Sequence, residues 1–158
     1  MEILLLYIVA RGGCFMQVKD LMSGSPITVD REETVSAAAR LLSRHNVGAL
    51  PVTTQGGKLV GMLTDRDITV RCVAANYDPN ITRVRTIMST GAVTVRAEES
   101  GLQAAKTMGK HQVRRLPVTQ DGKVIGMLSQ KDLVAGKTAD ADAVKAFREV
   151  FEQDHSDG

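Results

Sequence analysis

Two short stretches of the chain place a hydroxyl residue and a carboxylate at the same spacing. Thr64 precedes Asp67 in GMLTDRDI, and Ser129 precedes Asp132 in GMLSQKDL. Ser or Thr followed by an acid three residues later is a helix-capping signature, because each side chain accepts a backbone N–H at the helix start. An ionised carboxylate also accepts the two hydrogen bonds that a ribose diol offers. The spacing therefore indicates a helix start, a ligand site, or both.

These stretches belong to a longer internal repeat. Residues 18–53 align with 84–119 at an offset of 66, and 15 of the 36 positions are identical. After one residue is lost in a turn, residues 57–68 match 122–133 at an offset of 65. A duplicated unit of this size is a stronger signal than any single motif within it.

Each copy predicts the order β-α-β-β-α. A β-run (ITV at 27–29, VTV at 93–95) precedes an acidic pair, which we expect to open a helix because acids favour the positive helix end. Two short strands joined by a glycine-containing turn follow, and a second helix begins at Thr64 or Ser129. One copy of about 60 residues is marginally stable alone, so two packed copies are expected.

The repeat divides the chain into five predicted segments. Residues 1–15 are an extension that precedes a natural start at Met16; if ordered, they form an added strand. Their apolar run is too short to cross a bilayer, which takes about 20 residues. The C-terminal segment has apolar residues along one helical face. The remaining segments are a first unit at 16–76, a linker at 77–83, a second unit at 84–136, and the helix and tail at 137–158.

The composition argues against several classes of function. The 158 residues carry 20 basic and 18 acidic side chains, a net charge of +2, and only 3 % aromatics, which disfavours nucleic-acid binding. We expect no membrane role. The two cysteines make no disulfide framework and favour a reducing, cytoplasmic compartment. No metal-ligand spacing is present, and His45 and His111 fall at predicted helix C-termini.

Catalysis finds little support in the sequence. No Ser-His-Asp or Cys-His set recurs, and there is no Walker-type phosphate loop. The paired acids lie at helix starts, where a structural role is sufficient. We therefore predict that the protein is not an enzyme and needs no cofactor.

The two copies, each with LPVT, a glycine turn and GML[TS]xxD, resemble the CBS domain family, and specifically a CBS pair (Bateman module) of the stand-alone bacterial or archaeal type. The resemblance covers residues 17–135. It implies an α+β fold in which two units pack as a pseudo-twofold pair with clefts between them. It also implies a homodimer, and an adenine nucleotide or S-adenosylmethionine as the regulatory ligand in energy or metabolite sensing.

The resemblance also implies site residues. The ribose contacts would be Thr64, Asp67, Ser129 and Asp132. The backbone at the adenine edge would be Pro26, Ile27, Thr28, Ala92, Val93 and Thr94. The phosphate contacts would be Arg114 and Arg115. Bidentate guanidinium groups suit phosphate oxygens, and only one of two successive arginines on a strand can point into a given cleft.

The two copies are not equivalent. Asp65 adds negative charge to the first motif, whereas the second reads Ser-Gln-Lys-Asp and follows the arginine pair. If one cleft takes an anionic nucleotide, we expect the one that the arginines border; which aspartate shares it stays open. The predicted function is a non-enzymatic sensor of an adenosyl ligand that acts on an unidentified protein partner. The alternative is a ligand-independent interaction or oligomerisation module, and a metal-responsive protein ranks last.

Overall fold

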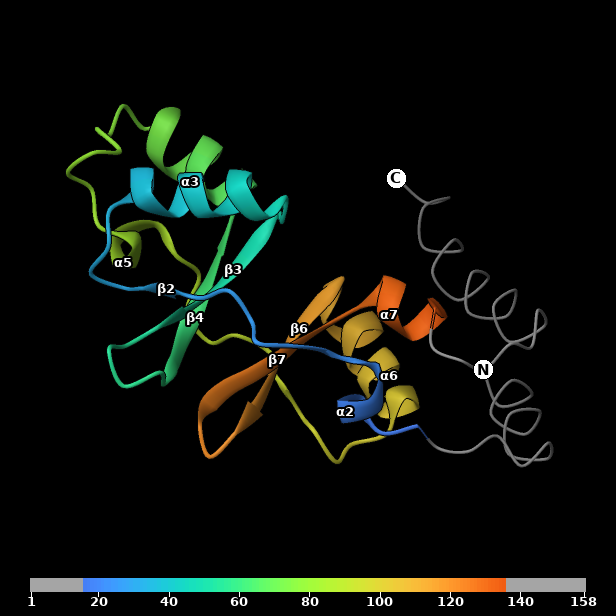
Figure 1. Ribbon diagram of the computed structural model, residues 1–158. Helices are drawn as coiled ribbons and strands as arrows, with labels where there is room; N and C mark the ends of the chain where they lie inside the picture. The colour runs from blue at the N-terminus through green and yellow to red at the C-terminus, as the bar shows by residue number, and fades with distance from the viewer. Residues whose placement is uncertain (1–15, 136–158) are drawn as a thin grey trace, which may run out of the picture.

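The computed structural model describes residues 16–135 (Figure 1). The predicted N-terminal extension and C-terminal helix lie outside this part of the chain. The first copy comprises β2 (Val29–Asp30), α3 (Val35–His45), β3 (Ala49–Thr53), β4 (Leu59–Thr64), α4 (Asp65–Asp67) and the π-helix η1 (Ile68–Val73). The second comprises β5 (Val95–Arg96), α6 (Gly101–His111), β6 (Arg115–Gln120), β7 (Lys123–Ser129) and α7 (Gln130–Ala135). The α+β fold with two tandem β-α-β-β-α units is confirmed.

Within each copy the strands have the same arrangement. The first edge strand pairs parallel to the next (β2 with β3, β5 with β6), and the last two form an antiparallel hairpin. Figure 1 shows the hairpins of both copies in the middle of the molecule, with α3 on one side and α6 on the other. Both hairpins shift register at the same repeat position, after Val52 and Val118. The pair therefore has the expected pseudo-twofold organisation.

The starts of the two long helices differ from expectation. The acidic pairs at 32–33 and 98–99 do not open α3 and α6. The N-caps are Thr34, whose Oγ1 accepts the Ala37 N–H at 3.2 Å, and Ser100, whose Oγ accepts the Gln103 N–H at 3.1 Å. A hydroxyl that satisfies a helix N–H directly fixes the start more firmly than a charge near the helix end.

The segments before the two copies are exchanged between them. Helix α5 (Val84–Ile87) precedes the second copy, but Val84 and Ile87 are buried in the first core with Leu50 and Leu63. Helix α2 (Val18–Leu21) precedes the first copy, but its Val18 is buried in the second core. The backbone contacts repeat as well, since the N–H of Val84 donates to Glu33 O and that of Val18 to Glu99 O.

The exchange continues into the sheets. Strand β1 (Ser23–Gly24) pairs antiparallel with β7, so that Ser23 lies opposite Met127. On the other side, Ser89 and Met62 of β4 exchange two backbone hydrogen bonds of 2.9 Å each. Each three-stranded β-β-β arrangement is thus extended by the chain that leads into the other copy. Neither core is complete without this crossed connection.

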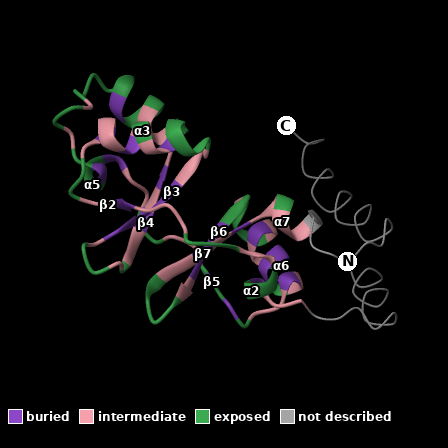
Figure 2. Cartoon of the chain, viewed as in Figure 1, coloured by how far each residue is buried: buried purple, intermediate pink, exposed green. Residues whose placement is uncertain are grey.

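The two cores are separate and aliphatic. Figure 2 shows buried residues on the strands and on the helix faces turned toward them. The first core contains Cys72, which is fully buried, and burial and the nearby Asp78 carboxylate raise the pKa of its thiol. The hairpin turns of the copies also meet, because the Leu59 N–H donates to Gly122 O at 3.1 Å.

Gly61 and Gly126 mark the crossing points. A methyl group on Gly61 would lie 2.5 Å from Ser89 O, and one on Gly126 would meet the Met22 sulfur and, at 3.0 Å, Ser23 O. Both obstacles include backbone, which cannot rotate away. Glycine is therefore required at both positions, because the crossing backbone passes close over the strand there.

We predict that Gly61→Ala lowers the free energy of unfolding by roughly 1–3 kcal/mol, because the methyl displaces the Ser89 strand. Gly109→Ala in α6 is the matched control, since a methyl there meets nothing within 4 Å. It should stabilise the protein by about 0.5–1 kcal/mol. Urea denaturation measures both. Equal stability of Gly61→Ala and the parent would contradict the packing described here.

Glu32 ties the loop before α3 to α5. Its Oε2 accepts from Arg85 Nε and its Oε1 from Arg31 Nε, each at 3.0 Å. Partial desolvation acts to raise the pKa of Glu32, but the hydrogen bonds and charges of Arg85 and Arg31 outweigh it and lower the pKa.

Because the pKa of Glu32 is lowered on folding, its stabilising contribution is present above the pKa of the unfolded chain. It is lost as pH falls through the pKa of the folded state. We predict that Glu32→Gln lowers Tm at neutral pH and that the difference vanishes in acid. Glu98→Gln, at the same repeat position but without a described side-chain partner, should show no such pH-dependent difference. A pH-independent effect of Glu32→Gln would exclude the ion-pair explanation.

Candidate functional site

The first Ser/Thr–Asp motif forms a reciprocal capping box at the junction of β4 and α4. Thr64 Oγ1 accepts the Asp67 N–H at 3.0 Å, and the Thr64 N–H and Oγ1–H donate to Asp67 Oδ2 at 2.9 and 2.8 Å. One carboxylate oxygen of Asp67 is thus held by two donors. We call Thr64 and Asp67 the first capping box.

Ser129 and Asp132 form the second capping box with the same geometry. The Ser129 N–H and Oγ–H donate to Asp132 Oδ2 at 2.7 and 2.6 Å, and the Asp132 N–H donates to Ser129 Oγ at 3.2 Å. Both boxes are half-buried. In each, the second carboxylate oxygen, Oδ1, is left over from the cap. A carboxylate fixed in this way can accept a further pair of hydroxyl donors without reorganising.

Arg115 starts beside the second capping box and extends toward the first copy. On the sheet its Cα lies opposite Ser129, so its side chain leaves from the second copy beside the second box. A methyl group placed on Gly48 of the first copy would lie 3.5 Å from Arg115 Nη1 and 3.5 Å from Asp65 Oδ2. The guanidinium therefore reaches the helix start of the first box. Of the two arginines that the sequence analysis named, Arg115 is therefore the one that lies near residues of both copies.

The first turns after the boxes differ. In the first copy, Asp65 Oδ1 accepts the Arg66 N–H at 2.7 Å, so the helix start already holds a carboxylate. In the second copy, Gln130 replaces this aspartate, and its N–H donates to Arg114 O at 3.0 Å. The second helix start therefore has no acid of its own at this position. The contrast between Thr-Asp-Arg-Asp and Ser-Gln-Lys-Asp is a contrast in charge at two otherwise matching ends.

The predicted adenine-edge segments enter the sheets just before β2 and β5. Ile27 and Val93 pack against the first and second cores, which leaves the backbone around them at the rim. Pro26, Thr28 and Ala92 are half-buried, and Thr94 is exposed. Within residues 16–135, no hydrogen bond or ion pair joins the side chains of these residues to either capping box.

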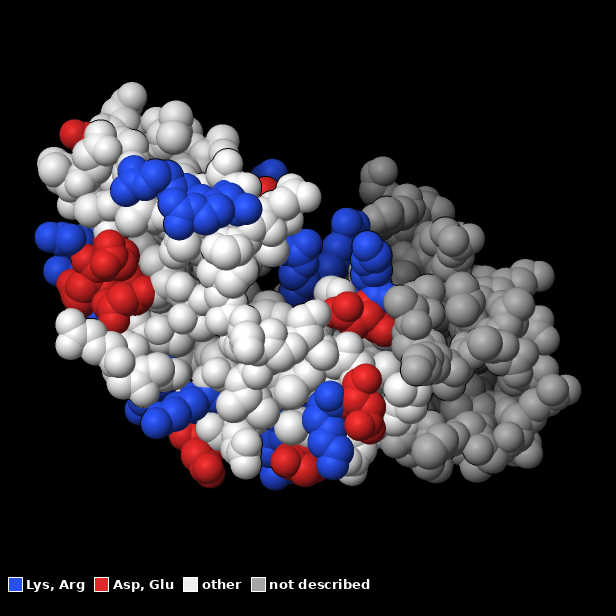
Figure 3. All heavy atoms as spheres, viewed as in Figure 1, with Lys and Arg blue, Asp and Glu red and all other residues white. Residues whose placement is uncertain are grey.

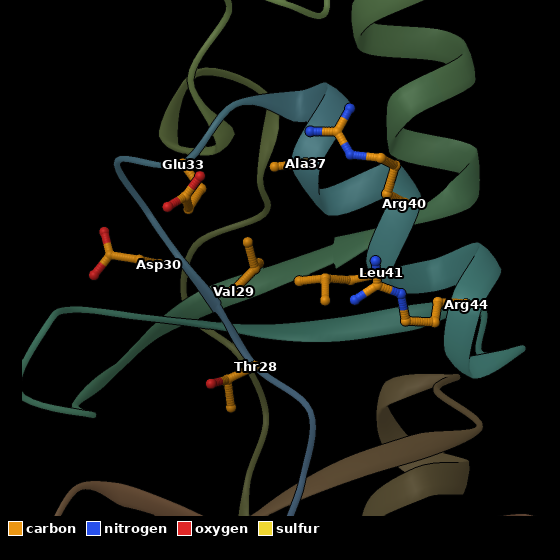
Figure 4. A pocket seen from close by; sticks show the side chains of 8 residues that line it. All are labelled: Thr28, Val29, Asp30, Glu33, Ala37, Arg40, Leu41 and Arg44. Carbon is orange, nitrogen blue, oxygen red and sulfur yellow. The ribbon is translucent and has the colours of Figure 1, made fainter.

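A surface pocket of about 390 Å³ adjoins one of these segments (Figure 4). It lies between β2 and α3, and Thr28 is the predicted site residue that lines it. Figure 4 shows Arg40 and Arg44 on the helix side and Asp30 and Glu33 on the strand side. Val29, Ala37 and Leu41 form its apolar part. The sequence analysis did not anticipate it, because the residues gather only when β2 is placed beside α3.

The charged surface is mixed. Figure 3 shows acidic and basic side chains interspersed, with a group of basic ones beside the hollow between the two halves. Across residues 16–135, no group of three or more His, Cys, Asp or Glu side chains is placed to hold a metal ion. No helix in the same range has the length and apolarity to cross a membrane.

Sequence reasoning missed two residues at the first box. Gly48 lies close to the Arg115 guanidinium, a proximity between copies that no local pattern reveals. Arg71 forms an ion pair with Asp67, Nη1 to Oδ1 at 3.5 Å. Its position four residues after Asp67 in a helical segment was a signal that could have found it.

The fold and the paired boxes define a tandem-repeat module with one capping box in each copy. The chain belongs to the CBS domain family, whose profile matches residues 18–73 and 84–136. A relative is the CBS domain-containing protein YhcV of Bacillus subtilis. It is 38 % identical over 136 residues, which cover 86 % of this chain and 96 % of that protein.

Three solved structures are similar to this chain. Hypoxic Response Protein I, solved with two coordinated zinc ions, superposes with a TM-score of 0.70 at 34 % identity, covering 75 % of this chain and 96 % of that one. The CBS domain pair of protein MJ0100, in complex with 5′-methylthioadenosine and S-adenosylmethionine, gives 0.68 at 30 % identity, covering 76 % and 94 %. CBSX2 in complex with AMP gives 0.66 at 28 % identity, covering 75 % and 93 %.

The capping role of the boxes can be tested without any ligand. We predict that Thr64→Ala and Ser129→Ala each lower the free energy of unfolding by about 1 kcal/mol, the usual cost of losing an N-cap. Thr64→Ser keeps the hydroxyl and should stay close to the parent. Urea denaturation monitored by circular dichroism provides the comparison. Unchanged stability of both alanine variants would mean that the hydroxyls do not support the helices.

Proposed function

We propose that this protein is a non-enzymatic regulatory module that binds an adenosyl ligand, either an adenine nucleotide or S-adenosylmethionine, at the capping boxes. The observation that carries the proposal is the duplicated Asp67 and Asp132 geometry. In each box, Oδ2 is committed to the cap and the carboxylate is fixed, so a ribose diol can donate to a group that is already oriented. Two similar structures hold adenosyl compounds, which supports this class of ligand.

The remaining contacts follow from the segments around each box. The backbone at Pro26, Ile27 and Thr28, and at Ala92, Val93 and Thr94, would meet the adenine edge. Of the arginine pair, Arg115 is the better candidate for a phosphate, because its guanidinium lies near Gly48 and Asp65 of the first copy while its Cα lies opposite Ser129 of the second. Arginine is suited to this because its planar fork matches phosphate oxygens.

The two sites would differ in the ligands that they prefer. Asp65 places a negative charge at the first helix start, next to Arg115, and so disfavours a phosphate there. Gln130 does not. The second site, with Ser129 and Asp132, is therefore the better nucleotide site. The first is suited to an adenosyl compound that carries no phosphate.

Signalling would follow from the crossed connections. A ligand bound between the copies shifts their relative packing by as much as its affinities for the two arrangements differ. Because each copy's core contains a helix from the other copy's lead-in segment, movement at one site is felt in both. A homodimer, a cytoplasmic location and a protein partner that reads the change complete the proposal.

The alternative is a ligand-independent interaction module. One observation favours it: the large apolar side chains that are exposed in the described chain all fall within residues 70–81. They are Val70, Val73, Tyr77 and Ile81, with exposures from 51 to 75 %. Such clustering is typical of surfaces that contact another protein.

A thermal-shift screen with AMP, ADP, ATP, S-adenosylmethionine and zinc separates these readings. We predict that at least one adenosyl compound raises Tm. At a concentration one hundred times Kd, the bound ligand should raise the free energy of unfolding by about 2.7 kcal/mol. The double variant Asp67→Ala/Asp132→Ala should lose this rise. Each single variant assigns one site, and AMP binding should suffer more from Asp132→Ala.

Glu98→Ala is the control. The Glu98 side chain is exposed, lies far from both capping boxes in the sequence, and has no described side-chain partner. It should respond to ligand as the parent does. If no adenosyl compound shifts Tm, the sensor proposal fails and the interaction module is favoured. A shift with zinc alone would favour a metal-responsive protein.

A further inference from the structure

The helix that follows the first capping box is not a regular α-helix. After the three residues of α4, residues Ile68–Val73 form the π-helix η1, and the Ala74 N–H donates to Thr69 O at 2.9 Å, five residues back. π-Helical turns are rare and occur frequently at functional sites. In the second copy, α7 continues as an α-helix from Gln130 to Ala135. The two copies therefore differ in backbone just beyond otherwise matching boxes.

The π-helix carries Arg71 to a position where it contacts three other groups. Arg71 Nη1 lies 3.5 Å from Asp67 Oδ1 and donates to Ile87 O at 3.1 Å and to Ser89 Oγ at 3.0 Å. Ile87 is the last residue of α5, so the guanidinium also caps the negative end of that helix. Arg71 thus joins the first box to the segment that crosses toward the second copy.

This contact changes what Asp67 can do. Oδ2 is held by Thr64, and Arg71 stands at Oδ1, so the carboxylate is fixed at both oxygens. The Asp67 side chain is only 14 % exposed. The 3.5 Å separation is an ion-pair contact and not a hydrogen bond, so Oδ1 keeps both lone pairs for the two hydroxyls of a ribose diol, while the guanidinium holds the carboxylate in place. The crossed strand in turn holds the guanidinium in place through Ser89.

The second box has no counterpart. The repeat offset of 65 places Gly136 where the first copy has Arg71, and glycine has no side chain to donate. Within residues 16–135, Asp132 Oδ1 has no hydrogen-bond or ion-pair partner. Among the residues that the structure describes, contacts therefore hold the Asp67 carboxylate at both oxygens and the Asp132 carboxylate at one.

We propose that Arg71 is a positioning residue that makes the first site selective for adenosyl ligands with an intact ribose diol. It acts through Asp67, and it does not need to touch the ligand. The second site, which lacks this arginine, discriminates less between ribose and 2′-deoxyribose. The inference rests on the proposed function, because it assigns the diol to Asp67.

The test isolates each site and compares two uncharged probes, adenosine and 2′-deoxyadenosine, by titration calorimetry. With the second site removed by Asp132→Ala, Arg71→Gln should weaken adenosine binding roughly two- to five-fold, the range expected for a half-exposed ion pair. It should leave 2′-deoxyadenosine binding unchanged. With the first site removed by Asp67→Ala, Arg71→Gln should leave adenosine binding unchanged.

Three further variants guard against a purely structural effect. Arg71→Lys keeps the charge and should recover part of the adenosine affinity. Ser89→Ala removes only the oxygen that supports Arg71, and should give a smaller loss of the same kind. Arg66→Gln, an exposed arginine in the same helical segment without a described side-chain partner, should change neither probe.

Each outcome decides. Arg71→Gln could weaken the binding of both probes equally in the Asp132→Ala background, or weaken adenosine binding in the Asp67→Ala background. Either result would mean that Arg71 acts through the fold. It would overturn this inference and leave the proposed function standing. If the parent protein binds neither adenosine nor any phosphorylated or sulfonium analogue, the proposed function falls and this inference with it. A diol-specific loss that Lys partly restores supports it.

Discussion

The crossed pairing of the two copies is the constraint on which the rest of this structure depends. Ser89 exchanges two backbone hydrogen bonds with Met62, and Ser23 lies opposite Met127 on the other side. A copy of about 60 residues is only marginally stable alone. Here each core is completed by a helix that precedes the other copy, so that each core depends on the pair.

That constraint also fixes where the sites lie. The capping boxes stand at the ends of β4 and β7, which are the two strands that the crossing segments cover. Gly61 and Gly126 lie three residues before Thr64 and Ser129 because the crossing backbone passes over the strand there. The motif Gly-x-x-[Ser/Thr]-x-x-Asp therefore records packing, capping and a fixed carboxylate in seven residues. Its cap and its proposed ligand contact are compatible, since they use different oxygens of the same aspartate.

The sequence was sufficient to predict the repeat, the order of elements and both capping boxes. Each of these leaves a local trace in residue type or in spacing. The exchange of α2 and α5 was not predicted, because it depends on which sheet edge a segment joins, and both edges look alike in a duplicated sequence. The starts of α3 and α6 were misassigned because a nearby hydroxyl competed with the acids for the same N–H groups. The partners of Arg115 required the relative placement of the copies.

The differences between the copies are informative for the same reason. After duplication, the packing at the two crossings demands the same glycine, hydroxyl and aspartate, and these are shared. The packing does not require the differences at two repeat positions, where the first copy has Asp65 and Arg71 and the second has Gln130 and Gly136. Those positions lie around the aspartate oxygens that take no part in the caps. A change there affects a bound ligand or a neighbouring charge and leaves the cap intact. Arg71 also supports the crossing segment through Ile87 O and Ser89 Oγ, but its ion pair with Asp67 Oδ1 has no equivalent at Gly136, which has no side chain. The asymmetry therefore favours two sites with different preferences over two redundant caps.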